Sequence, residues 1–100
     1  MPTIVVRYQP TAEHADENQH LVEAVFAELA ENRTDGIHYA TWRLADNTFI
    51  HIADITTEPN PLATNTAFQR FQTGILERCH PDTAPNAQSA TLIGNHNLLQ

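Results

Sequence analysis

The sequence predicts an α+β fold in which strands and helices follow one another in the order β-α-β-β-α-β. Two segments, near residues 12–32 and 61–79, carry apolar side chains at helical spacing. Four other stretches have strand-like composition, and turn-forming residues separate the segments. The chain has 100 residues, of which 41% are hydrophobic, so it has room for one domain with a buried core.

The first strand and the first helix have clear sequence signals. Residues 3–8 (TIVVRY) are rich in β-branched and aromatic side chains, which favours a strand. The helix is predicted to begin within residues 12–15 and to end at Asn32. Its apolar stripe recurs at i, i+4 and i+8, with two further apolar residues beside it: Leu21, Val22, Val25, Phe26 and Leu29. After this helix, Gly36 is available for a positive φ angle.

Residues 37–44 and 48–55 are predicted to form two strands of a hairpin, because residues 45–47 (Ala-Asp-Asn) favour a turn. If the second and third of these turn residues are its centre, Trp42 lies opposite His51. One face of the hairpin then carries Ala40, Trp42, Leu44, Phe49, His51 and Ala53. The other face carries Tyr39, Thr41, Arg43, Ile50, Ile52 and Asp54, with Tyr39 opposite Asp54. A change of one residue in the loop would exchange all of these partnerships.

The second helix is predicted from Pro61 to Cys79, with Asn60 as its N-cap and regular geometry from about Thr66. Four of its side chains share one apolar face: Phe68, Phe71, Ile75 and Cys79. Gly74 falls in the middle of this helix and costs it some stability. Residues 80–89 contain two prolines and are predicted to be a loop, followed by a final strand within residues 90–99.

The element order is that of the ferredoxin-like fold, a four-stranded antiparallel sheet with both helices on one face. The other face of the sheet should be polar in a monomer, yet Val5, Ile50 and Ile52 place apolar side chains on both faces of their strands. We therefore expect a homodimer in which two open sheet faces pack together and close an α/β barrel. The alternative is a monomer with an unusually apolar sheet.

Charge and composition exclude several classes of function. The chain has 12 acidic residues, five arginines and no lysine, giving a formal net charge of −7. This balance argues against nucleic acid and anionic membrane as partners. No apolar run reaches membrane-spanning length and no signal peptide is evident, so a soluble, cytoplasmic protein is expected.

Metal and cofactor motifs are not evident in the sequence. The single cysteine, Cys79, excludes an intrachain disulfide and a multi-cysteine zinc site, and is interpreted as a buried structural thiol. The six histidines lack metal-ligand spacing, and the three glycines form no phosphate-binding loop. We therefore expect no metal and no cofactor.

Several stretches together resemble the dimeric α/β-barrel superfamily, and within it proteins similar to the antibiotic biosynthesis monooxygenases. These are DENQHLVEAVFAELAENR, GIHYATWRL, TFIHIADI and NPL…AFQRFQTGILERC. They are similar to small bacterial proteins of that superfamily that have no assigned role. The superfamily includes cofactor-independent oxygenases of aromatic polyketides, whose substrates supply the electrons for oxygen, and haem-degrading oxygenases. The sequence lacks the first-strand asparagine and the second-helix histidine and tryptophan of the haem-degrading members, which argues against that activity.

One constellation suggests a ligand pocket between the sheet and the helices. His51 is the candidate catalytic base for a phenol or an enol, with Trp42 beside it. Phe68 and Phe71 would form the wall contributed by the second helix, and Tyr39 is a further candidate pocket residue. The alternative interpretation is a filled core in which a histidine is satisfied by hydrogen bonds. Tyr39 also belongs to a second polar set with Arg43 and Asp54, for which an ion pair within the sheet is the simpler interpretation.

Two functions follow as hypotheses. The first is a cofactor-independent monooxygenase that acts on a small aromatic or polyketide-like molecule. The second is a dimer that binds a small molecule, or is associated with stress, and catalyses no reaction. An open cavity into which His51 reaches would favour the first.

Overall fold

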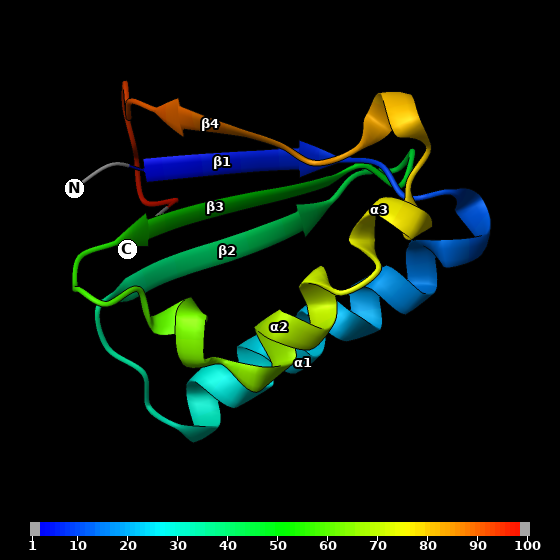
Figure 1. The fold of residues 1–100 in the computed structure, drawn as a ribbon. Coiled ribbons are helices and arrows are strands. Elements are labelled where there is room, and N and C mark those ends of the chain that lie inside the picture. The colour runs from blue at the N-terminus through cyan, green and yellow to red at the C-terminus, as the bar shows by residue number, and fades with distance from the viewer. Residues whose placement is uncertain (1–2, 99–100) are drawn as a thin grey trace.

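The computed structural model describes residues 3–98 and shows a four-stranded antiparallel sheet with the helices on one face (Figure 1). The strands are β1 (Thr3–Tyr8), β2 (Ile37–Arg43), β3 (Phe49–Ile55) and β4 (Asn86–Ala90), in the order β2-β3-β1-β4. The helices are α1 (Ala15–Glu31), α2 (Thr66–Gln72) and α3 (Ile75–Arg78). Short 3₁₀ turns cover Ala12–His14, Pro61–Thr64 and Pro81–Thr83. This architecture confirms the predicted ferredoxin-like fold.

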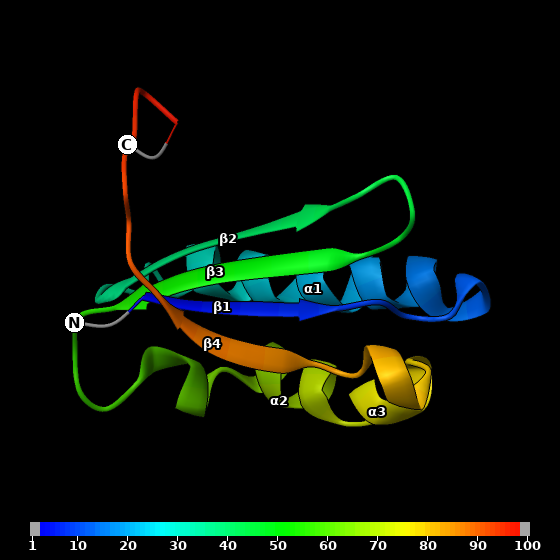
Figure 2. The same cartoon turned by 90° about the horizontal axis from the view of Figure 1, so that it is seen from above.

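The helices pack on the same face of the sheet as two separate groups (Figures 1 and 2). Seen from above, α1 lies on the side of β2 and β3, whereas α2 and α3 lie on the side of β4. The core between these layers contains apolar residues from the covered face and the helices: Tyr8, Val22, Val25, Phe49, Leu62, Ala67, Phe71 and Cys79. The predicted helix stripe and the predicted burial of the Cys79 thiol are therefore confirmed.

The predicted hairpin register is wrong by one residue. Thr41 lies opposite His51, and Trp42 lies opposite Ile50. The reason is the turn, which has three residues in its loop rather than two: Leu44 N–H donates to the Thr48 carbonyl at 2.8 Å. The last loop residue, Asn47, has a φ of 71°, the left-handed conformation that commonly closes a three-residue hairpin.

This register reassigns the two faces of the hairpin. Tyr39, Thr41 and Arg43 share the covered face with His51, while Trp42 shares the open face with Ile50. The predicted sets mixed residues of the two faces, because a shift of one residue turns each side chain of one strand to the opposite side of the sheet.

The final strand lies earlier than predicted. β4 consists of residues 86–90 (NAQSA), which pair with β1 from Arg7↔Asn86 to Thr3↔Ala90. The two prolines of residues 80–89 predicted a loop there, and the polar composition of the strand gave no sign of its pairing. Residues 91–98 are more apolar, but they follow Ala90, which pairs with Thr3 at the beginning of β1. They form no strand. The predicted strand also included Leu99, which lies outside the described residues.

The second helical region is interrupted rather than continuous. Gly74 has a φ of 81° and separates α2 from α3. Because a left-handed residue cannot continue a right-handed helix, the chain turns here. The predicted cap is present: Asn60 accepts a hydrogen bond from Leu62 N–H, but it caps a 3₁₀ turn. Asn65 caps α2 itself by accepting from Phe68 N–H at 2.7 Å.

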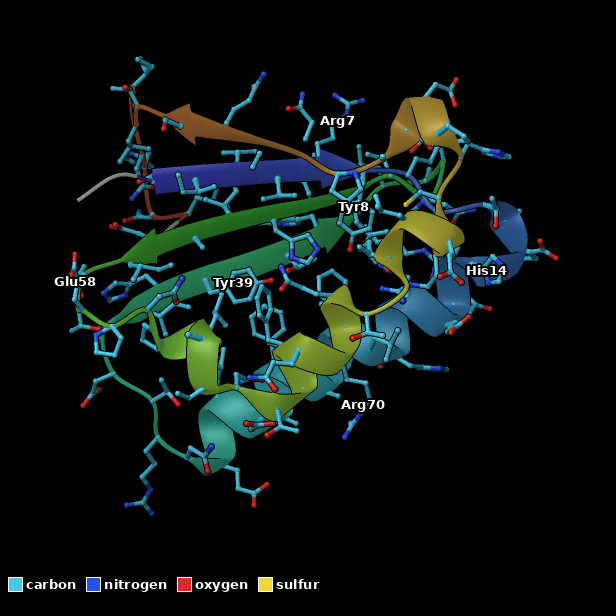
Figure 3. The ribbon with its side chains drawn as sticks, in the orientation of Figure 1. Arg7, Tyr8, His14, Tyr39, Glu58 and Arg70 are labelled. Atoms are coloured by element: carbon cyan, nitrogen blue, oxygen red, sulfur yellow. The ribbon has the colours of Figure 1, made fainter. Side chains whose placement is uncertain are left out.

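The face of the sheet turned away from the helices is partly apolar, and no helix or strand of residues 3–98 covers it. Val5, Ile50 and Ile52 lie on it half-buried, and Trp42 is 39% exposed. Arg7 projects from β1 on this side, away from the helices (Figure 3). Residues 91–98 extend from the end of β4 away from the sheet (Figure 2), with Leu92, Ile93 and Leu98 exposed.

Candidate functional site

A pocket lies between the covered face of the sheet and the α2–α3 region. Its volume is about 270 Å³, near the lower end for small-molecule sites and suited to a ligand of one or two rings. Strands β1 and β3 contribute Ile4, Val6, Tyr8, His51, Ala53 and Ile55 to its lining, and β2 contributes Tyr39. The remaining lining residues are Asn60, Leu62, Phe68, Phe71, Gln72, Ile75 and Pro85. This lining contains no carboxylate among the described residues, although the chain is acidic.

His51 is the polar centre of this apolar pocket. The imidazole is bonded at both nitrogens: Nε2 lies 2.8 Å from the Tyr8 hydroxyl, and Nδ1 lies 2.5 Å from the Tyr39 hydroxyl. The Thr41 hydroxyl is 3.1 Å from the same Nδ1. Figure 3 shows Tyr8 and Tyr39 in the space between the sheet and the helices. Alternation along antiparallel strands produces this cluster, because all four residues occupy positions on the covered face.

The aromatic rings around His51 hold it in place. Tyr8 and Tyr39 stack on the imidazole with ring centroids 5.3 Å and 5.7 Å away, and Phe71 lies 5.4 Å away. Phe26 of α1 in turn stacks on Tyr39 at 4.7 Å. The hydroxyl and imidazole groups are thus fixed by packing as well as by hydrogen bonds.

The polar cluster continues away from the pocket to α1 and α3. Asn18 Nδ2 donates to the Tyr8 hydroxyl at 2.9 Å, and Arg78 Nε donates to Asn18 Oδ1 at 3.2 Å. Arg78 also donates to the carbonyls of Phe71 and Thr73. Among residues 3–98 no carboxylate pairs with Arg78, which is 5% exposed. Its positive charge is therefore held by carbonyl and amide oxygens.

Burial determines the protonation of the cluster. Desolvation lowers the pKa of His51 from 6.5 to about 4, so its imidazole is neutral at neutral pH. Desolvation also raises the pKa of Tyr39 to about 12, opposed by a hydrogen bond with Thr41. It raises the pKa of Tyr8 still further. At neutral pH Tyr8, Tyr39 and His51 are thus neutral groups that can each donate and accept a hydrogen bond.

Four of the five residues predicted for the pocket line it: Tyr39, His51, Phe68 and Phe71. The predicted place of Trp42 is wrong, because the three-residue loop turns it to the open face. The predicted polar set of Tyr39, Arg43 and Asp54 is also divided between the two faces. Arg43 instead pairs with Asp16 at 3.0 Å and bonds Gln19 and Asn47.

Sequence reasoning missed Tyr8, Asn18 and Arg78 as parts of the site. A usable signal existed for Asn18, which lies four and seven residues before the buried Val22 and Val25. A polar residue on the buried stripe of a helix needs a hydrogen-bond partner in the core. The sequence has no such signal for Arg78, because Gly74 interrupts the helix between Phe71 and Arg78.

No group of three or more His, Cys, Asp or Glu side chains within residues 3–98 is arranged to hold a metal ion. The helices of the described chain are all too short or too polar to cross a membrane.

Comparison with known proteins shows the fold of the chain but not its activity. No family model matches the sequence, and no curated protein matches it. Among solved structures, a candidate antibiotic biosynthesis monooxygenase from Nitrosomonas europaea superposes with a TM-score of 0.71 at 9% identity, covering 94% of this chain and 100% of that one.

Two further solved structures are similar. A candidate antibiotic biosynthesis monooxygenase from Deinococcus radiodurans has a TM-score of 0.63 at 16% identity, covering 96% of this chain and 98% of that one. A dimeric ferredoxin-like protein of unknown function from Jannaschia sp. CCS1 has a TM-score of 0.63 at 14% identity, covering 91% and 98%. Identities this low leave the activity of the chain to be argued from its own residues.

Proposed function

We propose that the protein is a cofactor-independent monooxygenase that acts on a small aromatic molecule of one or two rings. The observation that carries this proposal is the polar cluster of Tyr8, His51 and Tyr39 in the wall of an otherwise apolar pocket. The similar structures named as candidate antibiotic biosynthesis monooxygenases support the same class of reaction.

The pocket would bind a flat ring by its apolar walls and exclude water from it. Phe68 and Phe71 are in ring contact with each other, at 6.0 Å between centroids, and both line the cavity. Ala53 is the small side chain on the sheet side. Apolar walls with few polar groups are typical of sites that orient a small molecule by one or two hydrogen bonds.

In the proposed reaction Tyr39 contacts the substrate and His51 acts through Tyr39. Both imidazole nitrogens are already bonded within the protein, so we assign His51 the role of holding the Tyr39 hydroxyl. The Tyr39 hydroxyl would stabilise the ionised oxygen of a phenol, whose proton leaves to solvent. A hydrogen bond to the charged form favours ionisation, and the electron-rich ring then reacts with O₂ at the para carbon.

The balance of this reaction needs no external reductant. For 1,5-dihydroxynaphthalene, a new carbon–oxygen bond forms at the para carbon and the O–O bond breaks. One oxygen atom becomes a quinone carbonyl, and the other leaves as water with the two hydrogens lost from the substrate. The substrate thus supplies every electron that oxygen takes up.

We further propose that two copies pack through their open sheet faces. The half-buried Val5, Ile50 and Ile52 and the exposed Trp42 form an apolar patch on this face. Such a patch is typical of a protein–protein contact. A second copy presents the same patch, as an interface with twofold symmetry requires. The similar Jannaschia protein is itself described as dimeric.

The proposal is tested by oxygen consumption with 1,5-dihydroxynaphthalene as the probe substrate. We expect wild-type protein to consume O₂ and form the coloured quinone, and Tyr39→Phe to lose at least about 90% of this activity, because it loses the hydrogen bond to the charged oxygen. Tyr39→Phe keeps the ring that stacks on Phe26. The control is Trp42→Phe, on the opposite face of the sheet, which should retain the activity.

A second candidate function is binding without reaction, which is favoured by the occupation of both His51 nitrogens. It predicts that the probe binds with an affinity that depends on Tyr39, while O₂ consumption stays at the rate of the buffer. Absence of both binding and consumption would contradict both functions.

A further inference from the structure

The hydrogen bonds that run from Arg78 to the pocket have a direction, because a guanidinium group can only donate. Arg78 Nε donates to Asn18 Oδ1, so the amide nitrogen of Asn18 is the group that faces Tyr8. Asn18 is fully buried. The orientation of its amide is therefore set by the cation behind it.

Tyr8 continues the same order of donor and acceptor toward His51. Its oxygen accepts from Asn18 Nδ2 at 2.9 Å, which leaves its own hydrogen for the neighbour on the other side, His51 Nε2 at 2.8 Å. A neutral imidazole carries one hydrogen. Because Nε2 accepts, that hydrogen is on Nδ1.

The chain of donors ends at Tyr39. His51 Nδ1 lies 2.5 Å from the Tyr39 oxygen and donates to it. The Thr41 hydroxyl lies 3.1 Å from the same Nδ1 and is a second acceptor for this hydrogen. The hydroxyl hydrogen of Tyr39 is then left for a ligand, and Tyr39 lines the pocket.

We propose that the chain Arg78–Asn18–Tyr8–His51–Tyr39 is a one-directional relay that presents a hydrogen-bond donor to the pocket and so selects ligands with an anionic or carbonyl oxygen. This inference rests on the ligand pocket of the proposed function. It names Asn18 and Arg78 as positioning residues, since neither lines the pocket. Ligands whose only polar group is a donor would be disfavoured, because Tyr39 would be left without an acceptor.

The charges around the relay agree with this selection. Arg78 is the buried cation at its far end, and the Cys79 thiol is a titratable group outside the relay that acts on Tyr8. Burial raises the pKa of that thiol, so it stays neutral at neutral pH. With no carboxylate in the described pocket lining, nothing there repels an anionic oxygen.

The direction of the relay is tested by the nitrogen-15 NMR shifts of His51, which distinguish a protonated ring nitrogen from an unprotonated one. Wild-type protein at neutral pH should show hydrogen on Nδ1 and none on Nε2. Asn18→Asp should exchange them, because a carboxylate at this place accepts from both Arg78 and Tyr8. His51 Nε2–H would then donate to Tyr8, and Nδ1 would accept from Tyr39.

Two variants keep this test decisive. Asn65→Asp introduces a carboxylate at another buried asparagine, whose oxygen caps α2, and should leave the His51 tautomer unchanged. Tyr8→Phe removes the donor to Nε2 and should abolish the preference for hydrogen on Nδ1. Hydrogen on Nε2 in the wild-type protein would overturn the proposal, whatever the activity of the protein.

The selection of ligands is tested with 4-nitrophenol, whose phenolate absorbs visible light. Wild-type protein should bind the phenolate at least about tenfold more tightly than the phenol, since hydrogen bonds to charged groups are the stronger ones. Asn18→Asp should remove this preference, and Asn65→Asp should keep it. Binding of the neutral phenol in preference would overturn the selection while leaving the pocket intact. No binding of either form would contradict the pocket of the proposed function and with it the selection, and the NMR shifts would still decide the direction.

Discussion

His51 shows how one residue connects the stability of the core to the chemistry of the pocket. It is 4% exposed, yet it needs partners for two polar nitrogens, and the tyrosines on the neighbouring strands supply them. A buried polar group is tolerated only when its hydrogen bonds are made. The same bonds keep a hydroxyl group at a fixed place in the pocket wall.

The burial of His51 predicts a loss of stability in acid. Its pKa is about 4 in the folded protein and 6.5 when unfolded, so between these values the unfolded chain binds a proton that the folded protein does not. The contribution of the neutral His51 side chain to the free energy of unfolding is complete above pH 6.5, and it is lost as the pH falls toward 4. We expect about 2 kcal/mol to be lost between pH 7 and pH 5 from this group.

Urea unfolding at the two pH values measures this loss. His51→Gln should remove most of the difference in the free energy of unfolding between pH 7 and pH 5. His38→Gln, which replaces an exposed histidine of β2, should keep the part of that difference that comes from His51. An equal pH dependence in wild type and His51→Gln would contradict the assignment.

Of the elements, α2 matters most to the pocket, because it carries Phe68 and Phe71. It has only 7 residues, too few to be stable on its own. Glu28 of α1 holds its beginning: the two carboxylate oxygens accept from Thr66 N–H and Ala67 N–H, each at 2.9 Å. A negative charge at this end of a helix is also favourable.

Loss of these two hydrogen bonds to Glu28 should destabilise the folded protein. Glu28→Ala is expected to lower the free energy of unfolding by about 1–2 kcal/mol, because two backbone donors lose a charged acceptor. Glu23→Ala, on the same helix, removes a single exposed contact with Gln19 and should change it by less than about 0.5 kcal/mol. Thermal or urea unfolding checks both, and equal effects would contradict a special role for Glu28.

The elements also show which parts of the structure were accessible to sequence reasoning. Helix α1 follows from its apolar periodicity, whereas the strands β1, β2 and β3 follow from their β-branched and aromatic side chains and the turn residues between them. Strand β4 was misplaced because its residues, NAQSA, join the sheet through backbone pairing with β1 rather than through composition.

The site was predicted in part for a similar reason. Phe68, Phe71, Tyr39 and His51 lie on segments whose buried face can be recognised in the sequence. Trp42 was misplaced because the number of loop residues decides the register, and Ala45–Asn47 is compatible with either count. Arg78 lies 60 residues after Asn18, so only the folded chain brings the two side chains together behind Tyr8.

The two faces of the sheet have different roles in the molecule. The covered face builds the core and the pocket, and the open face carries the apolar patch around Ile52 and Trp42. We expect the protein to be a dimer in solution. Ile52→Glu should produce a monomer, because it would bury a charge without a partner at the centre of the contact.

Native mass spectrometry measures this directly. The matched control is Leu76→Glu, which places the same charge at an exposed residue of α3 on the helical side and should remain a dimer. A monomeric wild-type protein would contradict the proposed contact, and a dimer unaffected by Ile52→Glu would move the contact to another surface.

The measurement that tests the central claim most directly is calorimetric titration of 1,5-dihydroxynaphthalene into the protein without oxygen. We predict one molecule bound per chain, about tenfold weaker binding by Tyr39→Phe, and no binding by Ala53→Phe, which fills the cavity from the sheet side. Equal affinity in all three proteins, or no binding by the wild type, would show that the pocket bounded by Tyr39 and Phe71 is not a ligand site.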